Sequence, residues 1–229
     1  MLKLIRLEWK KNNIIKYVRS AFIMAVILLI LILASAGELE AKDTELAYGK
    51  SMLKAGVEMF TNMSFIIFTS TMLASFIVGA YKNKTMNLMF SYPISRKKIM
   101  LSQMLAVWIF NFTALFLTKL LFYYVLAAVR GYGHMLAAGI VLDSGMFYAE
   151  ILVNSAVMVS VSFTALLAGL KMKSSKAAII AGVILVCITQ GNIGQYTLTG
   201  NMPFLMTLLF ISAASVFLAL YKVESRDVL

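Results

Sequence analysis

Residues 27–33 read ILLILIL, and they lie at the centre of an apolar run that extends from about residue 17 to residue 37. A helix that crosses the hydrocarbon core of a bilayer needs about 20 apolar residues, each adding about 1.5 Å of rise. Lipid offers no hydrogen-bond partner to a free backbone group, so such a segment must be helical. The run therefore predicts a membrane-spanning helix and an all-α integral membrane protein.

The composition of the whole chain supports this fold class. Apolar residues make up 61% of the 229 residues and charged residues only 14%, whereas soluble domains carry about 25% charged residues. The net charge is +11, but the basic residues lie between apolar runs. This arrangement indicates a membrane surface rather than a nucleic acid as the partner. The one cysteine, Cys187, excludes an intramolecular disulfide and a multi-cysteine metal site.

Five further apolar runs follow the first one along the chain. Together they predict a single transmembrane domain over residues 1–229 with six spans, at about 17–37, 55–81, 101–129, 146–170, 177–195 and 203–221. Residues 191–195 are polar and glycine-rich, which favours an irregular outer turn or a short re-entrant piece. Residues 135–142 are apolar but too short to span, so we expect them on the outer surface or tucked into the bundle.

The charge distribution predicts the orientation. An even number of spans places both termini on one side, together with the loops after the second and fourth spans. These parts of the chain hold 16 Lys and Arg but three acidic residues, whereas the opposite side holds four Lys and Arg and seven acidic residues. Because cytoplasmic loops carry an excess of Lys and Arg, we expect both termini in the cytoplasm of a cell whose plasma membrane holds the protein.

The loop between the second and third spans, residues 82–99, reads KNKTMNLMFSYPISRKKI. Thr85 can cap a short helix by accepting from free backbone N–H groups. Pro93 ends that helix because it has no N–H and restrains the residue before it. The result is a short apolar-faced helix at the membrane surface, joined rigidly to two spans. The alternative is a loop whose apolar residues dip into lipid.

Residues 1–16 predict an interfacial helix. Lys3, Arg6 and Lys10 share one helix face, while Ile5 and Trp9 lie on a neighbouring face with Leu2. A helix that lies in the membrane interface, with Trp9 at the depth of the headgroups, explains both faces. A generic membrane anchor would have the same pattern.

This order of parts resembles the permease subunit of type-2 ATP-binding-cassette (ABC) exporters. Members of that family have a basic N-terminal surface helix, six spans and a Thr-x-x-Leu-x-x-x-x-Pro-x-Ser-Arg segment that leads into the third span. The matching residues here are Thr85, Leu88, Pro93, Ser95 and Arg96. A short tail of basic and acidic residues after the last span, 222–227, is also similar. Asn83 and Lys84 stand where the family usually has an acidic residue and a glycine.

The resemblance implies a coupling helix that docks on two copies of a cytoplasmic ATPase subunit. Its contact residues would be Thr85, Met86, Asn87, Leu88, Met89, Phe90, Ser91, Tyr92, Pro93 and Arg96. A second contact would use Lys3, Arg6, Trp9 and Lys10. ATP and magnesium would bind to the partner ATPase, because the chain contains no G-x-x-x-x-G-K-[ST] motif and carries no cofactor or catalytic site of its own.

The resemblance also implies a second permease, identical or homologous, and an amphipathic or lipid-like cargo such as an antimicrobial or toxic peptide. Export of such a peptide, or self-immunity against it, would be the task. Small residues offer a close-packing face, either for the second permease or for neighbours within the chain; these are Ala177, Ala178, Ala181 and Gly182.

Polar residues inside the spans are candidates for a translocation path: Asn62, Asn111, Lys119, Asn154 and Gln190. The amides can instead form hydrogen bonds between helices, worth about 1 kcal/mol each. Lys119 lies about 27 Å along the third span, so we expect its side chain to snorkel to the outer headgroups. Its alternative role is that of a buried ligand for an anionic group.

Two other classes compete with the exporter. A membrane-embedded enzyme is disfavoured because the one histidine, His134, falls in an outer loop and no G-x-S-x-G or H-E-x-x-H motif is present. A channel or secondary transporter without an ATPase is the stronger alternative. Such proteins usually place ionisable residues or broken helices near mid-membrane, and the middle of each predicted span is nearly free of charge.

Overall fold

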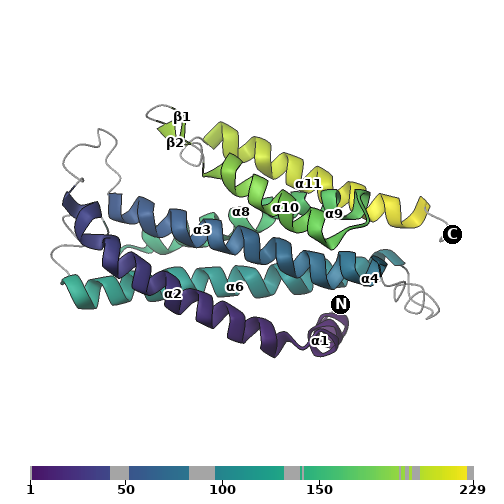
Figure 1. The fold of residues 1–229 in the computed structure, drawn as a ribbon, viewed down its shortest axis with the longest axis horizontal. Coiled ribbons are helices and arrows are strands. Elements are labelled where there is room, and N and C mark those ends of the chain that lie inside the picture. Colours follow the sequence, from purple (N-terminus) through teal and green to yellow (C-terminus); the bar gives the residue numbers. More distant parts are fainter. Residues whose placement is uncertain are drawn as a thin grey trace. The chain divides into compact units, whose positions relative to one another are not determined.

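The protein is predominantly α-helical in the computed structural model (Figure 1), which describes residues 2–41, 52–82, 96–131, 140, 142–190, 192–193, 196–197 and 202–225. A short π-helical segment, η2 (Ala74–Val78), separates α3 from α4. Two strands of two residues each, β1 (Asn192–Ile193) and β2 (Tyr196–Thr197), pair antiparallel. The helices are α1 (Leu2–Lys11), α2 (Ile14–Ala41), α3 (Met52–Leu73), α4 (Gly79–Lys82), α6 (Arg96–Arg130), α8 (Gly145–Val161), α9 (Thr164–Lys171), α10 (Ser175–Thr189) and α11 (Met202–Ser225).

Four stretches of helix in the described part of the chain are long and apolar enough to cross a membrane. They are Ile14–Ala36, Leu53–Val78, Lys97–Val129 and Gly145–Lys171. They coincide with the first four predicted spans, so the expectation of a helical protein is confirmed and a membrane location is compatible with it. The fifth and sixth predicted spans correspond to shorter apolar helices, Ser175–Thr189 and Met206–Tyr221. Six crossings therefore remain a prediction.

The end of the fifth predicted span differs from the sequence prediction. Helix α10 ends at Thr189 rather than continuing to residue 195, and Asn192 pairs with Thr197 in the register of β1 and β2. The prediction of a span up to residue 195 is therefore wrong. The physical reason is composition, because polar and glycine residues cost helix stability and favour turns.

The chain forms two compact units. The first contains residues 1–14, 65–111 and 157–229, and the second contains residues 15–64 and 112–156. Helices α3, α6 and α8 each contribute one part to the first unit and another part to the second.

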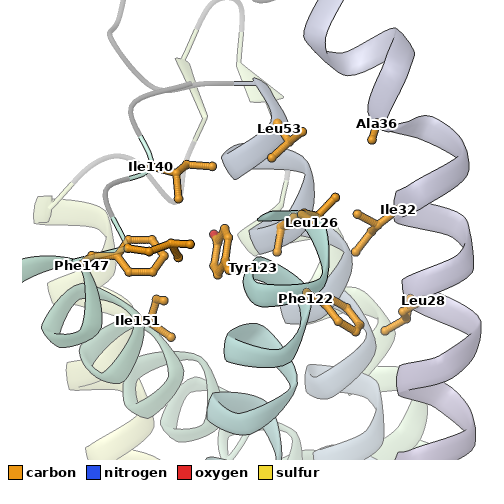
Figure 2. Close-up of a cluster of buried hydrophobic side chains, with 12 residues drawn as sticks. Leu28, Ile32, Ala36, Leu53, Phe122, Tyr123, Leu126, Ile140, Phe147 and Ile151 are labelled. Atoms are coloured by element: carbon orange, nitrogen blue, oxygen red, sulfur yellow. The ribbon is translucent and has the colours of Figure 1, made fainter. Parts of the chain in front are cut away.

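The second unit is built around an apolar cluster from four helices and from two residues that precede α8, Ile140 and Leu142 (Figure 2). Helix α2 contributes residues four apart, which lie on one helix face. The ring of Tyr123 meets the ring of Phe147 edge to face, with 5.0 Å between the ring centroids. The cluster consists of Leu28, Ile32, Ala36, Leu53, Val57, Phe122, Tyr123, Leu126, Ile140, Leu142, Phe147 and Ile151.

The first unit holds its helices together through small residues. Helix α10 packs against α9 and η2, and α11 packs against α9. Ala178 is fully buried, and a Cβ added to Gly169 would lie 2.7 Å from the Cβ of Ala178. A Cβ added to Gly182 would clash with the side chain of Ser70 on α3. Ala177, Ala178 and Gly182 therefore pack within the chain, which is the second of the two uses that the sequence left open for this face.

We expect Gly182→Ala to destabilise the protein by about 1–3 kcal/mol, because overpacking a close contact forces neighbouring atoms apart. The midpoint of unfolding by sodium dodecyl sulfate, followed by circular dichroism, measures this change. Gly145→Ala is the matched control, since nothing lies within 4 Å of the added Cβ. The double variant Ser70→Gly/Gly182→Ala should recover part of the loss. Equal midpoints for Gly182→Ala and Gly145→Ala would show that the close approach of α10 to α3 is wrong.

Candidate functional site

The residues predicted to form the coupling helix, Thr85 to Pro93, lie outside the described residues. Arg96 is the first residue of α6. The assignment of this segment as a contact for an ATPase therefore stays a prediction. The structure does describe both flanks of the segment, α4 before it and α6 after it, together with α1.

Helix α1 presents its basic face outward and docks its opposite face on α6. Lys3, Arg6 and Lys10 are exposed, as the division of the helix into faces predicts. Ile5 is 5% exposed. The Nε1 group of Trp9 donates a hydrogen bond to the carbonyl oxygen of Ala106 at 3.1 Å. Trp9 therefore helps to dock α1 on α6. The expectation that Trp9 lies among the headgroups does not account for this hydrogen bond.

A buried carboxyl group lies in the same contact. Glu8 is 6% exposed, and Gln103, from α6, is fully buried. The Nε2 group of Gln103 donates to Glu8 Oε1 at 3.5 Å, and Asn12 Nδ2 donates to Glu8 Oε2 at 3.4 Å. Burial raises the pKa of the Glu8 carboxyl, while the charge of Lys11 and the two amides oppose that rise. Sequence analysis missed this site, although one acidic residue in a basic helix was a usable signal.

The helix that leads toward the predicted coupling segment contains a widened turn. In η2 the helix adopts the π form, and the Gly79 N–H bonds to the carbonyl oxygen of Ala74. Ser175 Oγ, from α10, also donates to that oxygen at 3.3 Å. Single π turns inside α-helices occur frequently at functional sites. The α3–α4 helix is therefore locally irregular and tied to α10 at this point.

The five residues predicted to line a path are divided between the two units, and their role in a path stays a prediction. Asn111 and Gln190 belong to the first unit, whereas Asn62, Lys119 and Asn154 belong to the second. The Nδ2 group of Asn111 donates to Val107 O at 2.8 Å and to Met72 Sδ at 3.3 Å. Asn111 thus serves a contact between α6 and α3, which is the role that the sequence left open for the amides.

Lys119 is fully buried in the second unit. Its Nζ donates to Asn154 Oδ1, on α8, at 2.6 Å. The expectation that Lys119 snorkels to the headgroups is therefore wrong. Depth along a helix was known from the sequence, but the face of α6 that packs against α8 was not. The alternative role, that of a buried ligand for an anionic group, stays a prediction.

Two acidic residues of the second unit act on the charge of this lysine. The charges of Glu58 and Glu150 act on Lys119 through space. Glu150 also forms an ion pair with Lys54, with 2.6 Å between Oε2 and Nζ. The hydroxyl of Tyr123, one turn after Lys119, is buried and has no hydrogen-bond partner among the described residues. Among the described residues the hydrogen-bond partner of Lys119 is therefore Asn154, although an ammonium group has three donors.

Among the described residues, no group of three or more His, Cys, Asp or Glu side chains is arranged to hold a metal ion.

The chain is similar to a distant bacterial relative. The chain is 22% identical over 236 residues to the uncharacterized protein YcbO of Bacillus subtilis (strain 168), and the match covers 99% of this chain and 100% of the relative. No protein-family model matches the chain, and no solved structure matches it. The relative shares the full length of the chain.

Removal of Asn154 should cost more stability than removal of Lys119. Asn154→Leu leaves a buried ammonium without its hydrogen bond, which costs about 1–3 kcal/mol or more. Lys119→Met removes the charge as well, and replacing a buried charge by an apolar residue is often neutral. The double variant should therefore be more stable than Asn154→Leu alone.

Unfolding midpoints of the two single variants and the double variant form a thermodynamic cycle that isolates the interaction. Leu152→Met, at an exposed position of α8, is a control for substitution on the same helix. Additive effects of the two substitutions would contradict the contact between Lys119 and Asn154.

Proposed function

We propose that this chain is the membrane-spanning permease subunit of an ATP-driven exporter of the ABC type, worked by a separate cytoplasmic ATPase. The observation that carries the proposal is the docking of α1 on the first half of α6. Trp9 and Glu8 contact Ala106 and Gln103, about 10–15 Å along α6 from its first residue. The predicted coupling segment leads directly into that residue, Arg96.

This arrangement could transmit a force from a partner protein into the helices. A force on residues 83–95 would pass into α6 at one end and into α4 at the other. Helix α1 braces the same part of α6, so a partner that touches both α1 and the segment would move them together. The basic face of α1 remains exposed and is available for acidic groups of a partner or for anionic headgroups.

The widened turn in η2 supports the same reading. A π turn is a point at which a helix can change direction. It lies directly before α4 and the predicted coupling segment, so displacement of the segment could be absorbed there. In the proposal both termini and the segment lie in the cytoplasm, since the basic loops fall on that side of the plasma membrane.

The cargo in this proposal is amphipathic or lipid-like, such as a toxic or antimicrobial peptide, and a second permease completes the path. Lys119, on α6, and Asn154, on α8, are two polar groups that are hydrogen-bonded to each other within predicted spans. Ionisable residues in such positions commonly mark transport pathways. Asn62, on α3 in the same unit, is 2% exposed, and its Oδ1 has no partner among the described residues.

A second candidate is a secondary transporter that needs no ATPase. The buried Lys119 with nearby Glu58 and Glu150 favours it, because such transporters use buried ionisable groups. The two candidates differ in one requirement. The exporter requires an ATPase bound at the cytoplasmic segment, whereas the secondary transporter would work with this chain alone.

We expect Leu88→Asp/Phe90→Asp to abolish co-purification of an ATPase subunit from native membranes without changing the amount of inserted protein. Charge on the apolar face of the coupling helix would prevent it from entering an apolar groove. The measurement is affinity purification in mild detergent, followed by mass spectrometry and an ATP hydrolysis assay.

Met146→Asp is the matched control, since it adds a charge at an exposed apolar residue at the start of α8 and should leave the partner bound. An ATPase that is recovered equally with wild-type protein and with Leu88→Asp/Phe90→Asp would contradict the assignment of the coupling segment. Absence of any ATPase from the wild-type preparation would favour the second candidate.

A further inference from the structure

The contact between α1 and α6 contains a polar atom that the deprotonated form of Glu8 leaves unsatisfied. Gln103 Oε1 is buried and has no hydrogen-bond partner among the described residues. The same amide uses its Nε2 to reach Glu8 Oε1. An unpaired buried carbonyl oxygen costs about 1–3 kcal/mol, so this orphan acceptor beside a buried carboxyl group requires an explanation.

The partners of the Glu8 carboxylate are also weak. The two amide contacts are 3.5 and 3.4 Å long, whereas hydrogen bonds to charged groups are usually about 2.7–2.9 Å. Lys11 lies 3.8 Å from Glu8 Oε2 and is itself largely exposed. A carboxylate that is nearly excluded from water and held at such distances is poorly compensated.

A protonated Glu8 would satisfy both groups at once. Its O–H would donate to Gln103 Oε1, either directly or after a half-turn of the amide, which exchanges Oε1 and Nε2. The carboxyl C=O would then still accept from the amide N–H. A neutral acid and a neutral amide form a reciprocal pair of hydrogen bonds, and neither group carries a charge that must be desolvated.

We propose that Glu8 and Gln103 form a proton-binding site that locks α1 onto α6, so that docking of the N-terminal helix depends on pH. Of the charged side chains in the described part of the chain, the one that acts on Glu8 is Lys11. Helix α6 presents the neutral Gln103 to it. The site concerns the docking of α1 alone and does not require that an ATPase exists.

The direction of the dependence follows from linkage. Docking buries Glu8 and raises the pKa of its carboxyl above the value of the undocked helix, so the docked state holds the proton more tightly. Docking is therefore strongest below the ordinary glutamate pKa of about 4.3. It weakens as pH rises through the raised pKa of the docked state, and above that pH the weakening is complete.

The chain offers a built-in reporter for this experiment. It contains two tryptophans, so Trp108→Phe leaves Trp9 as the single tryptophan, which can be excited selectively and is bonded through Nε1 to Ala106 in the docked state. Full-length protein in lipid nanodiscs is titrated from about pH 4 to about pH 8, a range that starts near the ordinary glutamate pKa of about 4.3. Quenching of Trp9 by acrylamide and the infrared carbonyl band of protonated carboxyl groups are recorded at each pH.

We expect Trp9 to lose protection from acrylamide in one single-proton transition with a midpoint above the ordinary glutamate pKa. Glu8→Gln, which mimics the protonated form, should keep Trp9 protected at every pH and should lack the infrared band that titrates with the same midpoint. Glu150→Gln, which removes an exposed carboxyl group, should titrate like the parent protein.

Two results would overturn the proposal. One is constant protection of Trp9 across the pH range in the parent protein. The other is a transition that persists unchanged in Glu8→Gln. If Trp9 stays in the membrane interface after undocking, quenching would not report the transition, but the infrared band still would. A titrating carboxyl band that persists in Glu8→Gln would also contradict the proposal.

Discussion

The structure depends on one constraint. Several helix faces carry large apolar side chains that no other part of the described chain covers. Phe210 is 80% exposed and Phe217 69% exposed on α11, and Ile30 is 63% exposed on α2. In water each such side chain would forgo about 1.5–3 kcal/mol of burial. An apolar solvent removes that cost, and it also forces every backbone group to find its hydrogen bond inside a helix. The helical structure, the length of the helices and their exposed apolar surface therefore all follow from an apolar solvent.

The same constraint decides how polar side chains behave. Most hydroxyl groups bond to the backbone one turn earlier, as Thr61 does to Val57 O and Ser155 does to Ile151 O. This bond satisfies the hydroxyl within its own helix. The polar side chains that reach another helix are therefore the informative ones, and they include Lys119 with Asn154 and Glu8 with Gln103. Each joins two elements whose relative position it helps to define.

The sequence predicted where the helices lie along the chain better than it predicted which face of each helix packs against its neighbours. Hydropathy located the four helical stretches that are long and apolar enough to cross a membrane, and the charge pattern identified the exposed face of α1. Burial of Lys119 was not predictable, because the side of α6 that meets α8 depends on packing. The π turn in η2 has no distinct signature in an apolar run. The end of α10 at Thr189 was misjudged by extending an apolar run into polar, glycine-rich residues.

In the proposed function, the contact of α1 with α6 braces a cytoplasmic segment on which an ATPase acts, and Lys119 with Asn154 forms a polar pair within the predicted spans. The most direct measurement of the central claim uses lipid vesicles that contain the purified chain, with and without a co-purified ATPase, and follows efflux of a fluorescent amphipathic peptide. The account predicts efflux only when the ATPase and ATP are both present. ATP-independent efflux from vesicles that hold this chain alone would contradict it.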